Sequence, residues 1–426
     1  SGYVTAVTET LDKYYLFIER ALSLLKDTGV LGYIVPHKFM NIQSGAELRG
    51  LLSAHRNVKK IMHFGTHQVF ENRSTYTCIL IMSKQPNDEF QIGFVQNLNQ
   101  FLFEHTVECA TYAAPYLSRQ PWAFLPQSLI NQLHRAEENC EPLANLADIF
   151  VGVQTSADNI YIIHVDREDE ENGTEFQLEK GILRKSVYDA KLTSYEKITA
   201  NSYIIFPYKE VDGKPKLYDI EEMENQFPHA FEYLRRHKQA LDRRNMPNRT
   251  ELNWYAFGRS QSLRRFMSGE HLVWPVLSLS SNYVYDDELV VFTGGGNGPF
   301  YGLQMKQNAQ ESIFYVQAIL NHWLMELLVK SKASTFRGDY YSHGKQFIAT
   351  LPIYRIDYGN PSDVQKHDNI VEHVRTIMNL KNQANHARNT TEKTVFERSI
   401  NAVNDELNTL IDELYQVEAQ ENGDEE

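Results

Sequence analysis

The sequence predicts an α/β protein in three successive parts: the end of a doubly wound sheet, a mixed and mainly β domain, and a C-terminal helical hairpin. Helix-like and strand-like segments alternate at the start of the chain, and short β-rich runs separated by polar turns dominate from Leu143 to about Arg355. The last segment carries one narrow apolar seam at helical spacing. These patterns set the expected boundaries at residues 1–112, 113–142, 143–360 and 361–426.

The first part reads as helix, strand, helix and then further strands. Apolar residues between Leu11 and Leu25 recur at spacings of four and three, and Leu31–Val35 is a short strand of the buried type. Ser44 and Glu47 form a capping-box pattern before a second helix. Further strands are expected around Val58–Phe64, Thr75–Met82 and Phe90–Gln96. This order is typical of the end of a doubly wound sheet.

The middle of the chain predicts a linker followed by the β-rich domain. The linker is expected to hold one helix near Ser128–Glu138, and the acidic insert Asp166–Glu175 reads as a solvent-facing hairpin tip. Two helices are expected inside the domain, near Ala230–Asp242 and Ser312–Val329. Its strands are expected at Ile160–His164, Tyr203–Pro207, His271–Val276 and Leu289–Thr293.

The C-terminal segment predicts two paired helices. A seam from Phe396 to Leu414 steps by four and three, and a helix around Asp363–Lys381 is available to pair with it. Because the seam has an internal partner, we expect a monomer. The closing ENGDEE is acidic enough to predict disorder.

Composition limits the classes of protein that this chain can be. Three widely separated cysteines argue against a disulfide framework or a paired-cysteine metal site and are typical of a reducing compartment. Without an apolar run of about 18 residues or a signal-peptide pattern, the sequence predicts a cytoplasmic protein. No metal site is expected.

The net charge of −13 is unevenly distributed along the chain. Residues 363–426 hold 14 acidic and 6 basic side chains, whereas residues 229–265 hold 9 basic and 3 acidic ones. DNA binding depends on the local field over one face, so the basic stretch Arg235–Arg249 is a candidate phosphate clamp. A solvated helix face is the alternative interpretation.

Several segments, in this order, resemble adenine-specific DNA methyltransferases that carry a large C-terminal target recognition domain, including the type IIG fused restriction–modification enzymes. The matching segments are YYLFIERALSLLKDTGVLGYIVPHKFM (14–40), IMHFGTHQVFENRSTYTCILIMSK (61–84), DIFVGVQTSADNIYII (148–163), WYAFGRSQ (254–261), FTGGGNGPFYGL (292–303), FRGDYYSHGKQFIATLPI (336–353) and IDELYQV (411–417). The resemblance implies that residues 1–112 finish a methyltransferase sheet and that residues 143–360 read double-stranded DNA.

The family also carries a glycine-rich loop for S-adenosylmethionine and an Asn-Pro-Pro-Tyr tetrapeptide, and this sequence contains neither. The resemblance therefore implies that S-adenosylmethionine serves the full-length enzyme, that this chain binds no cofactor, and that it is inactive without a missing N-terminal half. Gly294–Gly296 does not open a helix after a strand, so we expect a tight turn or a close backbone approach there. A nuclease constellation is not recognisable, and any cleavage module of the parent would lie elsewhere.

By its position in the motif, the resemblance implies that Phe70 stacks on a flipped target adenine. The expected loop between two strands agrees with this role. The alternative is that Phe70 caps the edge of the sheet as core.

Four predicted loops carry the residue types that read base edges and bind phosphates. The candidates for DNA contact are Gln154, Thr155, Ser156, Arg259, Gln261, Arg264, Asn297, Lys332, Arg337, Tyr340, Tyr341 and Lys345. For each loop the alternative is ordinary surface, and for Tyr340 or Tyr341 it is packing. Two other classes of function stay open: a non-catalytic DNA-specificity subunit and a protein-interaction scaffold. An upstream glycine loop and tetrapeptide would favour the enzyme, and failure to bind DNA at any salt would favour the scaffold.

Overall fold

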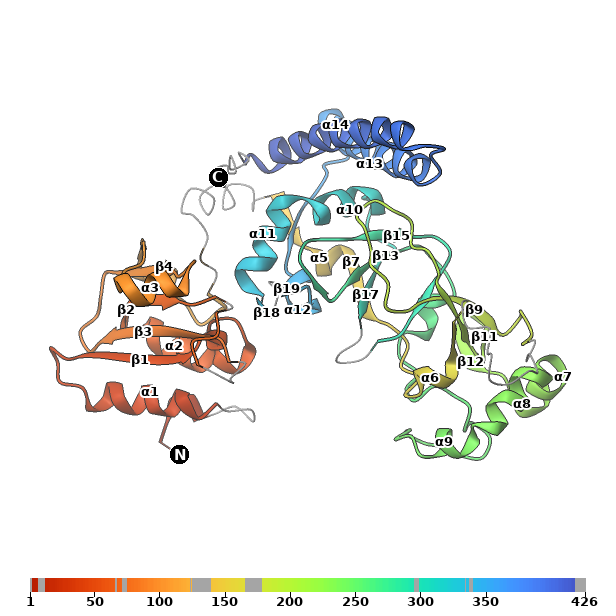
Figure 1. Cartoon of the computed structure of the whole chain (residues 1–426), viewed down its shortest axis with the longest axis horizontal. Coiled ribbons are helices and arrows are strands. Elements are labelled where there is room, and N and C mark those ends of the chain that lie inside the picture. The colour runs from red at the N-terminus through yellow and green to blue at the C-terminus, as the bar shows by residue number, and fades with distance from the viewer. Residues whose placement is uncertain are drawn as a thin grey trace. The chain divides into compact units, whose positions relative to one another are not determined.

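A computed structural model of the chain describes residues 2–6, 12–65, 67–70, 75–122, 124, 139–164, 178–294, 299–333, 335–336 and 340–417. The chain divides into two compact units, one made of residues 1–131 and 327–342 and the other of residues 132–326 and 343–426 (Figure 1). Within these described ranges, no helix combines the length and the apolar character needed to cross a membrane.

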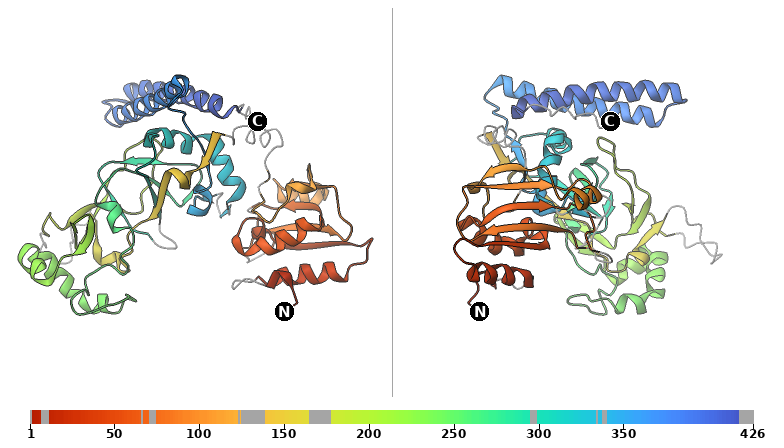
Figure 2. Two further views of the ribbon diagram at one scale, coloured as in Figure 1. Left: turned by 180° about the vertical axis from the view of Figure 1, so that it is seen from behind. Right: turned by 60° about the vertical axis from the view of Figure 1, so that its left-hand side comes forward.

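The first unit contains a five-stranded sheet with two principal helices. Its elements are η1 (Val4–Ala6), α1 (Lys13–Leu24), β1 (Val30–Pro36), η2 (His37–Met40), η3 (Gln43–Gly45), α2 (Ala46–Ala54), β2 (Val58–His63), β3 (Thr77–Ser83), β4 (Glu89–Phe94), α3 (Leu98–Glu104), β5 (Ala110–Ala113), η4 (Ala114–Tyr116), β18 (Thr335–Phe336) and β19 (Tyr340–Ser342). The strands follow the order β1-β3-β2-β4-β5. The sheet is drawn in red and orange in the right-hand view of Figure 2.

Strand directions in this sheet are mixed. Only the β2–β4 pair is parallel; β1–β3, β2–β3 and β4–β5 are antiparallel. Because β1 and β2 are both antiparallel to β3, they run in the same direction, and α2 lies between them along the chain. That helical connection agrees with the predicted end of a doubly wound sheet. In the described residues β3 follows β2 without a helix and runs the opposite way, which a loop connection allows.

The apolar stripe of α1 packs as its spacing predicts, with Tyr15, Ile18 and Leu22 in the core of the first unit. The predicted capping box is wrong. Ser44 lies inside η3, and α2 begins after Gly45 without a side-chain cap, while Glu47 pairs with Arg119. The first unit also extends beyond residue 112, since the core includes Tyr112, Leu117 and Trp122.

The second unit contains four small sheets and the remaining helices. Its elements are β6 (Cys140–Pro142), α5 (Leu143–Leu146), β7 (Ala147–Val151), α6 (Asp158–Tyr161), β8 (Ile162–His164), β9 (Leu183–Val187), β10 (Ser202–Ile205), β11 (Tyr208–Val211), β12 (Lys214–Leu217), α7 (Ile220–Gln226), α8 (Pro228–Arg236), α9 (Lys238–Asp242), η6 (Leu263–Phe266), β13 (His271–Pro275), β14 (Leu277–Ser278), β15 (Val284–Asp286), β16 (Val291–Phe292), β17 (Phe300–Met305), α10 (Ile313–Asn321), α11 (Trp323–Lys332, whose last residues belong to the first unit), α12 (Lys345–Ile348), β20 (Pro352–Tyr354), α13 (Pro361–Asn385) and α14 (Thr390–Tyr415).

Two four-stranded sheets organise the second unit, β16-β9-β10-β8 and β15-β13-β17-β7. An aromatic core joins them: Phe150 of β7, Phe292 of β16 and Phe266 of η6 lie with ring centroids 5.1 to 6.0 Å apart. Large rings packed at such separations bury much apolar surface and restrict how the two sheets meet. The loops that follow β7 and β16 are therefore held close together.

The C-terminal helices α13 and α14 form the predicted hairpin, shown in blue in Figure 1. Tyr415 of α14 is fully buried, and its hydroxyl donates to Pro352 O at 2.8 Å while accepting from Tyr354 N at 3.1 Å. The single helix expected at Ser312–Val329 is instead α10 and α11, separated at His322. Asp412 of α14 accepts from the Trp323 indole at 2.8 Å beside this break.

Three predicted segments lie outside the described residues: the linker helix near Ser128–Glu138, the acidic tip Asp166–Glu175 and the acidic end of the chain. In the described part, the expectation of a mixed α/β chain with C-terminal helices is confirmed.

Candidate DNA interface

The turn after β7 packs directly on the chain that leaves β16. Val153 N donates to Phe292 O at 2.9 Å, and Gly294 N donates to Val153 O at 2.8 Å. A Cβ built on Gly152 would lie 2.3 Å from Phe292 O, and one on Gly294 would lie 2.3 Å from Gly152 N. Glycine is required on both sides of this contact. The close backbone approach expected at the glycine cluster is thus confirmed for Gly294.

The same turn also pairs with the WYAFGRSQ loop. Arg259 N donates to Gln154 O at 3.1 Å, and Gly258 N donates to Thr155 O at 3.0 Å. A Cβ on Gly258 would lie only 2.1 Å from Ser156 Oγ, so the two loops touch without room for a side chain between them. Three loops that are far apart in sequence therefore converge in the second unit.

Two of the predicted contact residues in these loops, Ser156 and Arg259, are exposed, and Gln154 is partly exposed. Thr155 is fully buried, and its hydroxyl donates to the Asp158 carboxylate and accepts from Ala157 N at 3.0 Å. The Thr155 side chain supports the turn from inside rather than presenting a polar group to a ligand.

Further cations lie on segments attached to this cluster. Arg264 is exposed on η6, and Gln261 is partly exposed just before it. Lys345 is exposed at the start of α12, and its Nζ donates to Ile149 O of β7 at 3.1 Å. The Arg265 guanidinium already donates hydrogen bonds within the chain, to the Gln304 amide oxygen and to the Asp148 carboxylate at 2.8 Å.

Five further residues were predicted to contact DNA. Asn297 and Arg337 lie outside the described residues. Lys332, Tyr340 and Tyr341 belong to the first unit, where Tyr340 is 42% exposed.

The basic run 235–249 is largely neutralised by ion pairs on the same surface. Its partners are Glu224 for Arg235, Glu232 for Arg236, Asp242 and Glu251 for Lys238, and the same two acids for Arg249. Arg243 is exposed, whereas Arg244 points its donors at backbone carbonyls. These ion pairs argue against a phosphate clamp made by the whole run, because four of its six arginine and lysine side chains already have carboxylate partners.

Phe70 lies between β2 and β3, as expected, and is 45% exposed, so it is not a core residue. It follows the end of the sheet at which β1, β2 and β4 finish. The rings of His37 and His63 lie at that end with their centroids 4.2 Å apart and their planes tilted by 47°. Burial lowers the pKa of His37 to about 4, and burial together with the neighbouring His37 lowers the pKa of His63 to about 3. Both imidazoles are neutral at neutral pH.

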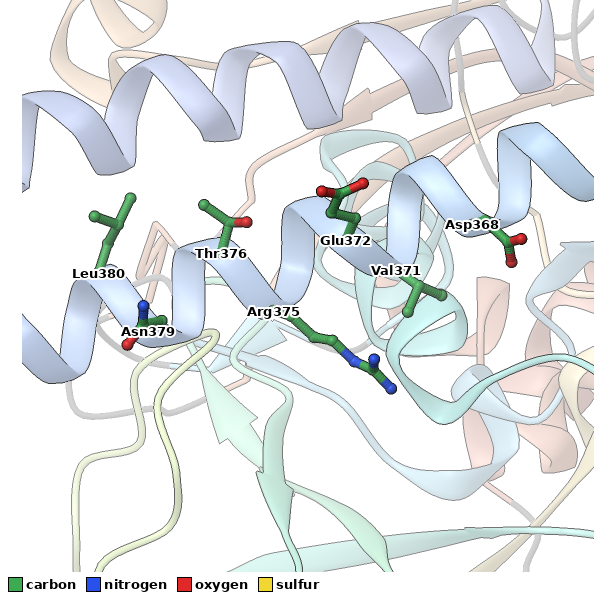
Figure 3. Close-up of a pocket in the computed structure, with 7 residues that line it drawn as sticks. All are labelled: Asp368, Val371, Glu372, Arg375, Thr376, Asn379 and Leu380. Atoms are coloured by element: carbon green, nitrogen blue, oxygen red, sulfur yellow. The ribbon is translucent and has the colours of Figure 1, made fainter.

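The structure also has a groove along α13, lined by Asp368, Val371, Glu372, Arg375, Thr376, Asn379 and Leu380 (Figure 3). All of these residues come from one helix, and the lining contains none of the predicted DNA-contacting residues. The groove therefore adds nothing to the candidate interface.

Comparison with known proteins identifies relatives of the chain. The family model of the Eco57I restriction-modification methylase matches residues 1–70. The type II restriction enzyme and methyltransferase RM.Eco57I of Escherichia coli is 30% identical over 425 residues, or 95% of this chain and 42% of that protein. This chain is a relative of the type II restriction–modification methyltransferases. The resemblance predicted from the sequence is confirmed.

A second relative and a solved structure are also similar to this chain. The type II methyltransferase M.BanIII of Aneurinibacillus aneurinilyticus is 21% identical over 382 residues, covering 80% of this chain and 63% of that protein. The chain thus spans less than two thirds of either relative. The type IIL restriction–modification enzyme MmeI, solved in complex with DNA, shares the fold with a TM-score of 0.63 and 12% identity, over 98% of this chain and 52% of that one.

Proposed function

We propose that this chain is the DNA-reading part of a site-specific adenine DNA methyltransferase of the type II restriction–modification group. The observation that carries the proposal is the convergence of three polar loops, around Gln154, Arg259 and Gly294, in the second unit. The similarity to RM.Eco57I supports it, as does the fold shared with MmeI, which was solved bound to DNA.

The converged loops have the chemistry of base readout. Arg259 can donate two hydrogen bonds to a guanine edge, and Gln154 can pair with an adenine edge. Ser156 can contact either a base or a phosphate, while Arg264 and Lys345 lie on attached segments and would bind phosphates. Because the turns are joined through backbone contacts, these side chains would be presented as one rigid set.

Phe70 would stack on the extruded adenine in the full-length enzyme. Its exposed ring and its place in the loop after β2 support this role. Asn297, Arg337, Lys332, Tyr340 and Tyr341 stay proposed DNA contacts on the resemblance alone.

The described part of the glycine cluster does not fit S-adenosylmethionine. Its one described member, Gly294, packs against the backbone of Gly152 and so leaves no room there for a cofactor carboxylate. The methyl donor would therefore be bound by the glycine-rich loop that other members of the family carry, and we assign no methyl-transfer step to these 426 residues.

Selection of bound duplexes from a random-sequence DNA pool tests the proposal. We expect one short motif to be enriched, with an affinity that falls as salt rises because phosphate contacts release counterions. Salt-sensitive binding without enrichment would mean that this chain holds DNA but does not read it. Failure to bind at low salt would overturn the proposal and favour an interaction scaffold, for which the net charge of −13 is the supporting observation.

A further inference from the structure

We propose that Arg244 is a specificity-determining positioning residue, which holds two DNA-reading loops in register without touching DNA. This inference rests on the proposed function of those loops. Arg244 differs from the neighbouring cations of the run 235–249. Four of those cations form ion pairs with carboxylates, whereas Arg244 donates to backbone carbonyls.

The guanidinium of Arg244 joins three segments of backbone. One terminal nitrogen donates to Thr155 O at 2.7 Å, the other donates to Trp254 O at 2.7 Å, and Nε donates to Leu241 O at 3.0 Å. Thr155 belongs to the turn that carries Gln154 and Ser156, and Trp254 begins the loop that carries Arg259. A planar fork with fixed donor directions is suited to fixing the separation of two loops.

Tyr161 reinforces the same arrangement. The Arg244 guanidinium lies 5.6 Å from the centre of its ring, and the Tyr161 hydroxyl donates to Tyr255 O at 2.9 Å. Tyr161 is fully buried, so its ring gives the cation a fixed face to lie on. Arg244 is partly buried and directs its donors inward, which distinguishes it from the exposed Arg243.

The carbonyl oxygen of Thr155 links the turn that carries Gln154 to the loop that carries Arg259. It accepts from Arg244 and also from Gly258 N at 3.0 Å, while the Thr155 hydroxyl is bonded to Asp158 and Ala157 on the other side of the turn. A lysine at 244 would keep the charge, but its compact ammonium cannot reproduce the three fixed donor directions. Loss of this tie would let the Gln154 and Arg259 side chains move relative to each other.

The expected effect is on discrimination rather than on general affinity. Misplacing one base-reading side chain reduces preference for the correct base by about ten-fold or more. Phosphate contacts made by other cations would be unchanged, so binding to unrelated duplexes and its dependence on salt should stay within about two-fold of wild type.

The experiment uses the whole chain, the enriched duplex, and versions of that duplex with single base-pair substitutions. Arg244→Lys is compared with Arg243→Lys, the same substitution one residue earlier on an exposed side chain. We expect R244K to lose at least about ten-fold in discrimination and R243K to match wild type. Thr155→Val, which removes the hydroxyl on the other side of the turn, should lose discrimination in the same way.

Several results would overturn the inference. The inference fails if R244K discriminates between duplexes as well as wild type does. It also fails if R244K weakens binding to every duplex equally. If R244K fails to fold, T155V decides: retained binding with lost discrimination supports the inference, and unchanged discrimination overturns it. If the wild-type chain enriches no motif, the proposed function itself fails, which separates that outcome from a failure of Arg244 alone.

Discussion

Replacing Gly258 with alanine tests how closely the turn at Ser156 and the WYAFGRSQ loop approach each other. The added Cβ would lie 2.1 Å from Ser156 Oγ and 2.7 Å from Ser156 Cβ, well inside ordinary van der Waals contact. Ser156 cannot withdraw easily, because its side chain is short and its backbone has a φ of 57°. The alanine should therefore push the turn at Ser156 away from the WYAFGRSQ loop.

The magnitude follows from known effects of overpacking. Forcing one methyl group into a filled contact costs about 1–3 kcal/mol. Ser156→Gly removes the two nearest of the three atoms that the new Cβ meets and leaves only Thr155 O at 3.3 Å. Glycine also accepts the left-handed backbone at position 156 without penalty. The double variant should recover most of the loss, which gives a coupling of about 1–3 kcal/mol between the two sites.

Native-state hydrogen exchange of the β7 and β16 amides is the assay, because it measures the opening free energy of this part of the second unit. The four proteins of the cycle are wild type, G258A, S156G and the double variant. Additivity of the two single effects within about 0.5 kcal/mol would refute the close contact. Discrimination between duplexes, measured in parallel, should fall for G258A and return in the double variant.

Three further predictions concern other parts of the chain. Tyr415→Phe removes the hydroxyl that bonds both Pro352 O and Tyr354 N, and should reduce the free energy of unfolding by about 2–4 kcal/mol in urea titrations; a loss below about 0.5 kcal/mol would contradict this. His37 is neutral in the fold with a pKa of about 4 against 6.5 when unfolded, so its contribution is present above pH 6.5 and is lost as pH falls towards 4. Hydrogen exchange of β1–β3 should accordingly show less protection at about pH 5 than at pH 7, with about 2 kcal/mol of the loss due to His37 and a further loss of the same sign due to His63. His37→Gln should remove the share of His37 and leave that of His63. In a full-length methyltransferase, Phe70→Ala should weaken capture of a fluorescent adenine analogue and leave duplex binding nearly unchanged, since Phe70 is 45% exposed; equal loss of both would argue against stacking.

Local patterns were sufficient to predict many individual elements. The helix α1 and the strand β13 appear within a few residues of their expected places, and Phe70 falls between two strands as expected. These features depend on the spacing of apolar residues along a short segment, which the sequence displays directly. The capping box at Ser44 failed, because three residues there form a 3-10 helix that ends in Gly45.

The partners of charged side chains could not be predicted from the local sequence. The run 235–249 looked like one basic surface, but Glu224, Glu232, Asp242 and Glu251 neutralise much of it. Asp242 lies within the run and Glu232 lies three residues before it, in the same helix as Arg235 and Arg236. Their pairing still depends on how the helices and turns of this segment pack against each other. The role of Arg244 was hidden for the same reason, since its partners are carbonyls of Thr155 and Trp254.

The sequence by itself determined the resemblance to type II restriction–modification methyltransferases, the periodic elements and the polar residue types of the loops, because each depends on the order of residues along the chain. Tertiary structure alone decided which loops meet. Gln154, Arg259 and Gly294 are brought together by the packing of the sheets that contain β7 and β16, and by hydrogen bonds between distant backbone groups. It also decided that Thr155 faces inward and that most of the first sheet is antiparallel. Contacts between residues this far apart arise only when strand order and strand direction are settled.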